Sequence, residues 1–136
     1  MNGWRNLLSY WLVYCAGCST QSPQSTIRMT AELDLFSGRP NPTWTLTTDE
    51  STRLAALLAD LPPADQAPAD PGLGYRGVVL QNPEPSPNLP ARIRFYRGVV
   101  LLGDDPAQRF RDVHDVEHQL LRQASAQGYA ALVDSL

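Results

Sequence analysis

An alternating stretch near the start of the chain constrains the fold more than any other feature. Between residues 26 and 36 polar and apolar side chains take turns, which puts five apolar side chains on one side of an extended chain: Ile27, Met29, Ala31, Leu33 and Leu35. This alternation predicts a β-strand with one buried face. Two prolines and a glycine in residues 37–42 end the strand in an irregular loop.

Two helices are expected after this strand. Thr47 and Glu50 have the spacing of a capping box, and a stripe of leucines follows until a proline pair ends the helix. A second helix is predicted to start at Asp105, which is followed by a proline suited to the first helical position. We expect it to run to about residue 127, where Gly128 closes it.

Further strands are predicted over residues 43–46, 75–81, 92–96 and 99–102. The last two flank Arg97-Gly98 and are predicted to form a hairpin. The order of elements predicts one α+β domain over residues 26–136, with an antiparallel sheet of about four to five strands and two helices packed on one face.

The first 17 residues have the pattern of a signal peptide. Arg5 precedes an apolar run over residues 7–16, whose ten residues reach roughly 15 Å as a helix, about half the hydrocarbon thickness of a membrane. Residues 18–25 are rich in serine and glutamine, as in a flexible tether.

The run Cys15-Ala16-Gly17-Cys18 resembles the lipobox of bacterial lipoproteins, with Cys15 where leucine is usual. The resemblance implies acylation of Cys18 by two chains, such as palmitate, which is enough for stable anchoring. The expected location is then the bacterial cell envelope, facing the periplasm and lipid-anchored. An uncleaved interfacial anchor and ordinary secretion are the alternatives.

Charge and cysteine content exclude some function classes. The formal net charge is −3, all basic residues are arginine, and one of them lies in the leader. A mildly acidic domain is a poor nucleic-acid binder, so no nucleic-acid partner is expected. Residues 26–136 contain no cysteine and no G-x-S-x-G motif, and no cofactor is predicted.

Residues 72–77 match the dinucleotide pattern G-x-G-x-x-G. That site needs a preceding strand and a following helix, whereas a proline-rich loop precedes these glycines and a strand follows them. The glycines are therefore interpreted as a bend.

His114, Glu117 and His118 spell H-x-x-E-H, the inverted zinc-protease motif, and on one helix the two histidines could share a metal. Two histidines at the edge of an apolar stripe are the default interpretation, and no metal site is assigned.

Glu117 falls inside that stripe, where a carboxylate needs a partner. Arg39, Arg76 and Arg97 are candidate partners, and we expect a structural ion pair with Arg39 that pins the loop over residues 37–42. The alternative is that Glu117 turns to solvent.

Residues 37–44 form the most specific string in the chain, Ser-Gly-Arg-Pro-Asn-Pro-Thr-Trp. Two X-Pro steps stiffen it, and a stiff loop loses little entropy on binding. Arg39, Asn41 and Trp44 are therefore the predicted binding residues, unless Trp44 packs in the core.

Arg92, Arg94 and Tyr96 share one strand face, which suits either RNA or an anionic glycan, or is simply solvated.

The string Phe36–Leu46, the glycine-rich residues 72–77, and a late helix containing Glu117 and Leu121 resemble an uncharacterised family of small bacterial proteins with an SGRPNPxWxL motif. This resemblance implies no activity. The leading hypothesis is a membrane-anchored envelope lipoprotein carrying a non-enzymatic binding or inhibitor-like domain, with an envelope protein as partner. The alternatives are a small metal-dependent hydrolase using the H-x-x-E-H helix, and a structural component of an envelope complex.

Overall fold

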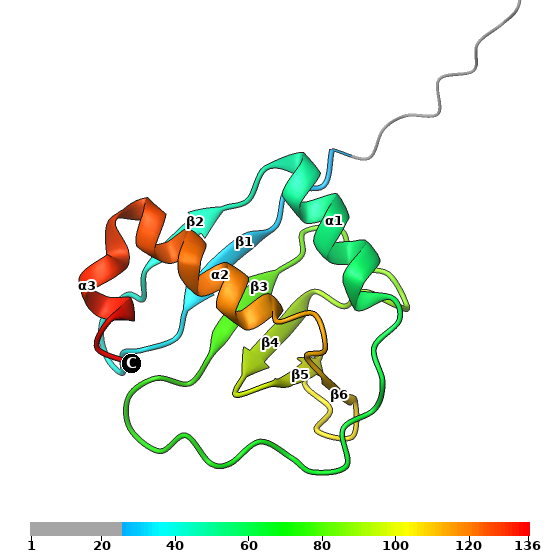
Figure 1. The fold of residues 1–136 in the computed structure, drawn as a ribbon. Coiled ribbons are helices and arrows are strands. Elements are labelled where there is room, and N and C mark those ends of the chain that lie inside the picture. Colours follow the sequence, from blue (N-terminus) through cyan, green and yellow to red (C-terminus); the bar gives the residue numbers. More distant parts are fainter. Residues whose placement is uncertain (1–25) are drawn as a thin grey trace, which may run out of the picture.

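The computed structural model describes residues 26–136, shown in colour in Figure 1. The predicted signal peptide, the tether and Cys18 lie outside these residues. Within them, no helix combines the length and the apolar character needed to cross a membrane.

The described chain is an α+β domain built on one antiparallel sheet of six strands, in the spatial order β2-β1-β3-β4-β5-β6 (Figure 1). The strands are β1 (Thr30–Leu33), β2 (Thr43–Thr45), β3 (Val78–Gln81), β4 (Arg92–Tyr96), β5 (Val99–Leu102) and β6 (Arg109–Arg111). The predicted class is confirmed, and the sheet has one strand more than the predicted four to five.

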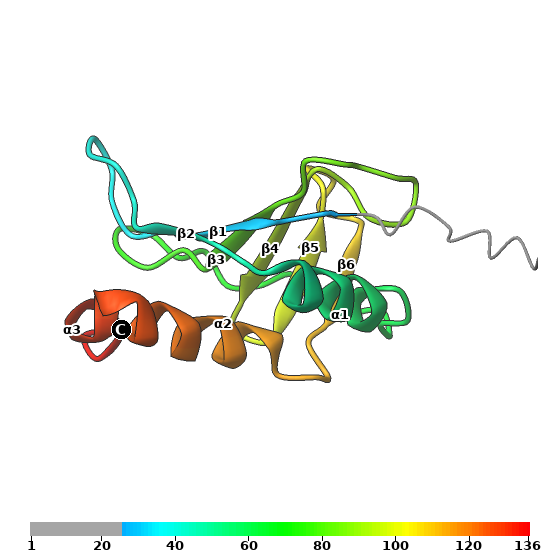
Figure 2. The same cartoon turned by 90° about the horizontal axis from the view of Figure 1, so that it is seen from above.

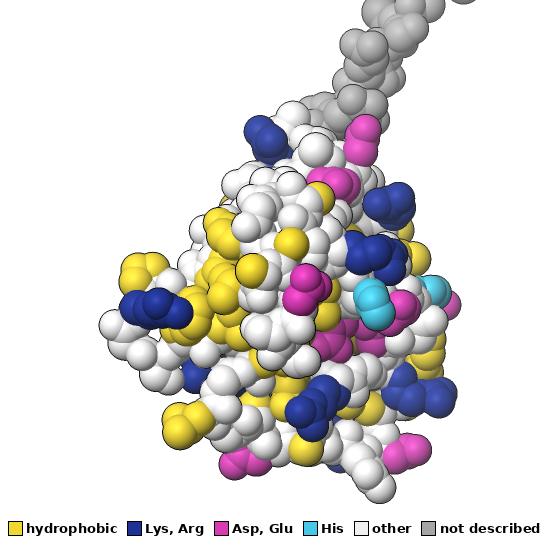
Figure 3. Space-filling model, turned by 60° about the vertical axis from the view of Figure 1, so that its left-hand side comes forward, with side chains coloured by type: hydrophobic (Ala, Val, Ile, Leu, Met, Phe, Trp, Pro, Cys, Tyr) yellow, Lys and Arg dark blue, Asp and Glu magenta, His cyan; other side chains and the backbone are white. Residues whose placement is uncertain are grey.

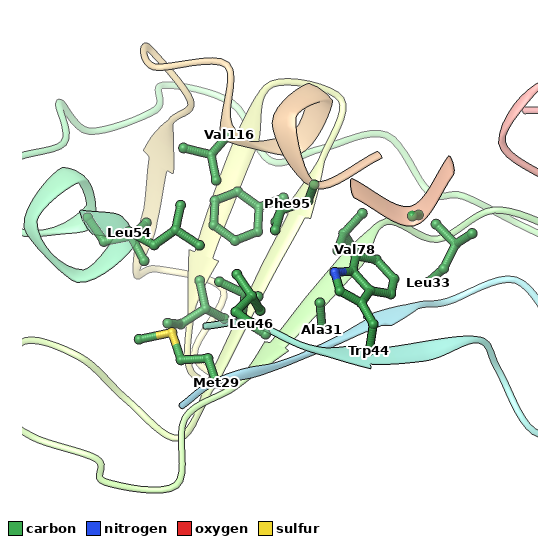
Figure 4. Packing of buried hydrophobic residues seen from close by; sticks show 14 of the residues in the cluster. Met29, Ala31, Leu33, Trp44, Leu46, Leu54, Val78, Phe95 and Val116 are labelled. Carbon is green, nitrogen blue, oxygen red and sulfur yellow. The ribbon is translucent and has the colours of Figure 1, made fainter. Parts of the chain in front are cut away.

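Helices α1 (Thr48–Leu58) and α2 (Val116–Ala124) both lie on one side of the sheet, as Figure 2 shows. The core fills the space between the two layers (Figure 4). Its side chains come from alternate strand positions and from the inner helix faces, and include Met29, Ala31, Leu33, Leu46, Leu54, Val78, Leu80, Ile93, Phe95, Val100, Val116 and Leu120. Burial of these apolar side chains is the main stabilising term, at roughly 25 cal/mol per Å².

The start of α1 forms as its sequence predicts. The Thr47 side chain accepts a hydrogen bond from the Glu50 amide, and the Glu50 carboxylate accepts one from the Thr47 amide. One turn later, the buried Ser51 hydroxyl accepts a hydrogen bond from the Met29 amide at 3.0 Å. This bond joins the helix to the strand segment below it.

The second helix starts later than predicted. Asp105 makes a local turn instead, in which its side chain accepts a hydrogen bond from the Ala107 amide and its carbonyl accepts one from Gln108. Residues Arg109–Arg111 then pair with β5, and their outer edge bonds to the segment after α1 through Pro62 and Ala64. A strand forms here because its backbone groups find hydrogen-bond partners on both sides, in β5 and in the segment after α1. Local sequence patterns do not reveal such partners.

Helix α2 is capped from outside. The Asp112 carboxylate accepts hydrogen bonds from the amides of Val116 and Glu117, both at 2.9 Å. At its other end a wider turn, η1 (Ser125–Tyr129), is interrupted by the left-handed Gly128 before the short helix α3 (Ala130–Val133). The predicted break at Gly128 is confirmed.

The predicted hairpin between β4 and β5 also forms. Arg97 and Gly98 both have positive φ, at 48° and 79°, as a two-residue turn of type I′ requires.

Candidate functional site

A loop over residues 36–42, here called the projecting loop, stands out from the end of β1 on the side of the sheet away from the helices (Figure 2). Its base is fixed by Asn41. The side-chain oxygen of Asn41 accepts hydrogen bonds from the amides of Leu35 and Phe36, at 3.0 and 2.8 Å. Its amide nitrogen donates to Glu32 and Asp34. Asn41 thus acts as a brace inside the loop.

Asp34 is the centre of an ion-pair network beside this base. Its Oδ1 lies 2.6 Å from Nη2 of Arg76, and its Oδ2 lies 2.8 Å from Nη1 of Arg94. Arg76 also donates to the Phe36 carbonyl at 3.0 Å and to the Ser37 hydroxyl at 3.1 Å. The network therefore ties the projecting loop to the strand β4, which lies two strands away in the sheet.

Burial alone would raise the pKa of the Asp34 carboxyl, since 9% of its side chain is exposed. Hydrogen bonds and charge from Arg76 and Arg94 outweigh this and hold the pKa below its usual value. Asp34 stays ionised, and the cluster of one carboxylate and two guanidinium groups carries a net positive charge.

At the tip of the projecting loop, Arg39 is exposed and its guanidinium carbon lies 3.5 Å from the centre of the Phe36 ring. This cation–π contact limits the positions open to both side chains. The expected ion pair between Arg39 and Glu117 does not form. Arg39 lies over Phe36, and Glu117 has other partners.

Glu117 accepts a hydrogen bond from the Tyr75 hydroxyl at 2.6 Å and one from the Gly98 amide at 3.2 Å. Burial, followed by the bond to Glu117, raises the pKa of the Tyr75 hydroxyl, so this group remains a donor. Glu117 thus contacts the glycine-rich segment through Tyr75, and not the loop over residues 37–42 that it was expected to pin.

Trp44, predicted as a binding residue, has 7% of its surface exposed and packs in the core (Figure 4). Its ring nitrogen donates to Gln123 at 3.3 Å, and its ring lies 6.5 Å from that of Tyr129. Of the three predicted binding residues, Asn41 and Trp44 thus have internal partners, and Arg39 is the one at the surface.

The H-x-x-E-H motif does not lie on one helix. His114 precedes α2, which begins at Val116, and both histidines are exposed. In Figure 3 they lie at the surface beside acidic side chains. His118 approaches Asp115 at 3.9 Å, but residues 26–136 contain no group of three or more His, Cys, Asp or Glu side chains arranged to hold a metal ion. In the part of the chain that the structure describes, the two histidines therefore do not share one helix, as the hydrolase alternative expected.

The strand face with Arg92, Arg94 and Tyr96 is not a continuous basic surface. Arg94 is tied to Asp34 and to the Arg76 carbonyl, and Tyr96 is 3% exposed, which leaves Arg92 as the exposed member of the three. An extended strand face for RNA or a glycan is absent from this part of the chain.

The glycines of residues 72–77 form a bend. Gly77 has φ +110°, and its backbone passes so close to the Phe95 carbonyl that a Cβ there would overlap it. The Gly77 carbonyl accepts a hydrogen bond from the Asp34 amide at 3.0 Å. Gly77 is needed for close approach of two backbones, and no helix follows to receive a pyrophosphate.

Sequence reasoning missed Asp34, Arg76 and Tyr75 as site residues. Asp34 lies on the polar side of the alternating strand, and this position indicates solvent exposure. Its partners lie 42 and 60 residues away in the chain. The glycine-rich residues 72–77 contained one signal, because they are among the three strings that carry the resemblance. In the structure, Arg76 donates to the Phe36 carbonyl in the projecting loop and Tyr75 donates to Glu117 in α2. The three strings therefore contact one another.

Comparisons with known proteins add no assignment: no family model matches the chain, and no curated protein or solved structure is significantly similar to it.

Proposed function

We propose that residues 26–136 form a non-enzymatic binding module that recognises an envelope protein through its projecting loop. The observation that carries this proposal is the projecting loop itself, whose tip is exposed while its base is fixed by Asn41 and Arg76. A loop held in one conformation before binding loses little entropy on binding, which is the usual requirement for an inhibitor-like contact.

Arg39 is the proposed anchor. Arginine is frequent among the residues that dominate binding energy, because its guanidinium group combines charge, hydrogen bonding and stacking. Its contact with the Phe36 ring presents a cation and an aromatic edge together. The partner would offer a carboxylate, or an aromatic ring and a carboxylate, to this pair.

We also propose that a lipid on Cys18 holds the module to the envelope membrane. The described chain begins at residue 26 beside the start of β1, and the projecting loop follows the opposite end of the same strand. Strand β1 therefore separates the projecting loop from the anchored end of the chain. This arrangement would place the loop on the side of the module away from the membrane, where a partner could reach it.

Replacing Arg39 by alanine is expected to abolish capture of the partner. Full-length protein carrying a C-terminal affinity tag would be purified from detergent-solubilised membranes, and co-purifying proteins would be quantified. Arg39→Ala should reduce the partner by at least roughly ten-fold, with little change in thermal stability because Arg39 is exposed. Arg92→Ala is the matched control, since Arg92 is also exposed and lies on the sheet. Equal loss in both variants, or no loss in Arg39→Ala, contradicts the proposal.

Replacing Cys18 by alanine is expected to abolish lipid anchoring. Two acyl chains give stable anchoring, and without them the protein should fractionate as a soluble species or retain its leader. Membrane fractionation with mass determination of the N-terminus measures both outcomes. Retention in the membrane with cleavage at the same place shows that Cys18 is not lipidated. This result would leave the loop hypothesis standing.

A further inference from the structure

A cavity of about 290 Å³ lies on the sheet face away from the helices. It is lined by side chains of the sheet, by the Asp34 network and by the proline-rich residues 68–71. The lining residues are Asp34, Pro68, Ala69, Asp70, Pro71, Arg76, Arg94, Tyr96 and Leu101. Its size is at the lower end of the range for small-molecule sites.

Arg94, which lines this cavity, keeps unused hydrogen-bond donors. Both of its bonds use Nη1, to Asp34 at 2.8 Å and to the Arg76 carbonyl at 2.7 Å. Nε and Nη2 have no acceptor among residues 26–136, and this part of the molecule has no buried side-chain nitrogen or oxygen without a partner. These donors therefore reach solvent. Nε and Nη2 form one edge of the guanidinium plane, which matches the two oxygens of a carboxylate.

The Tyr96 hydroxyl is a second polar group with unused hydrogen-bonding capacity. Its ring lines the cavity and lies 5.8 Å from the Tyr75 ring, but its hydroxyl has no hydrogen-bond partner in the described residues. A hydroxyl can donate to a carboxylate oxygen that a guanidinium already holds. Three other lining residues, Pro68, Pro71 and Leu101, are apolar.

The charges that line the cavity are balanced, which disfavours a dianion. Two arginines face two aspartates, and Asp70 is partly engaged by its own loop, where Oδ1 accepts a hydrogen bond from the Gly72 amide. The cavity has no net charge to attract a phosphate dianion. The directed donors of Arg94 favour a planar monoanion instead.

We propose that this cavity binds a carboxylate attached to a short apolar group, held by the Nε–Nη2 edge of Arg94 with the hydrocarbon part against Pro68, Pro71 and Leu101. The carboxylate could belong to a free small acid or to the C-terminus of a peptide. This site is separate from the tip of the projecting loop and does not depend on the function proposed for it.

The test uses the Arg Nε–H signals of the ¹⁵N-labelled full-length chain, with the Arg94 signal assigned by its loss in Arg94→Lys. Isovalerate represents a free acid and N-acetyl-leucine a peptide C-terminus; their amides and inorganic phosphate are the comparison probes. We expect a saturable shift of the Arg94 signal with a dissociation constant in roughly the millimolar range. The amides should bind at least about ten-fold more weakly, since they lose the charge-assisted pair.

Ala69→Leu should weaken acid binding by filling the cavity without altering the Arg94–Asp34 pair. Ala67→Leu is its control, because Ala67 is exposed in the same segment and does not line the cavity. A response to isovalerate supports a free acid as ligand, and a response to N-acetyl-leucine alone supports a peptide C-terminus. Equal shifts from acids and amides, a response to phosphate alone, no shift at all, or unchanged binding in Ala69→Leu would each overturn the proposal.

Discussion

Gly77→Ala should unfold the domain or lower its melting temperature far more than the same change at Gly74. Both glycines have φ +110°, so alanine suffers the same backbone strain at either position, about 1–2 kcal/mol. At Gly74 a Cβ would meet nothing within 4 Å. At Gly77 it would overlap the Phe95 carbonyl oxygen and lie 3.1 Å from the Tyr96 Cβ, which forces β3 and β4 apart.

The added overlap is expected to bring the cost at Gly77 to roughly 3–5 kcal/mol, and this is a large part of the stability of a domain of this size. Denaturant unfolding of Gly77→Ala and Gly74→Ala, each compared with the wild-type chain, measures the difference. Equal effects in the two variants would show that the close approach of Gly77 to β4 is not a constraint on the fold.

Asp34→Asn is expected to destabilise the domain by roughly 2–4 kcal/mol at neutral pH. The change keeps the shape of the side chain but removes the charge shared by Arg76 and Arg94, and leaves two guanidinium groups facing each other. Asp60→Asn is the control, since Asp60 is exposed at the end of α1; its effect should stay within about 0.5 kcal/mol.

The effect of Asp34→Asn should also depend on pH in a defined direction. The folded-state pKa of Asp34 lies below its unfolded value of about 3.9, so its charge stabilises the folded state fully above that value. This stability is lost as the pH falls through the folded-state pKa. The unfolding free energies of the wild-type chain and Asp34→Asn should therefore converge in acid. A constant difference down to strongly acidic pH would mean that the ion pairs are not its source.

The parts of this fold that could be predicted are those whose signals are local. The alternation in β1, the capping box at Thr47 and the Arg97-Gly98 turn each depend on residues within a few positions of one another, and each forms as expected. β6 could not be predicted, because its backbone is satisfied by β5 and by the segment after α1. The pattern Asp105-Pro106 suits a helix start equally well when taken alone.

The candidate site divides in the same way. Two prolines predict a stiff loop over residues 37–42, and Arg39 lies exposed in that loop, but the ion pair expected between Arg39 and Glu117 does not form. The partner of Glu117 could not be predicted, because Tyr75 and the candidate arginines are all remote from it in sequence. The choice among them depends on the bend at Gly77, which places Tyr75 beside α2. The role of Asp34 could not be predicted either, because it lies on the polar side of the strand and its partners Arg76 and Arg94 are 42 and 60 residues away.

The central claim, that the projecting loop is the contact surface of a binding module, is tested most directly by photo-crosslinking in living cells. A photoreactive amino acid would replace Ser37, which is exposed in the projecting loop and leaves Arg39 in place, in one strain and Arg92 in another. Crosslinked products would be compared after irradiation. The predicted result is a discrete adduct with an envelope protein from position 37 and none from position 92. No adduct from position 37, or the same adducts from both positions, would contradict the claim.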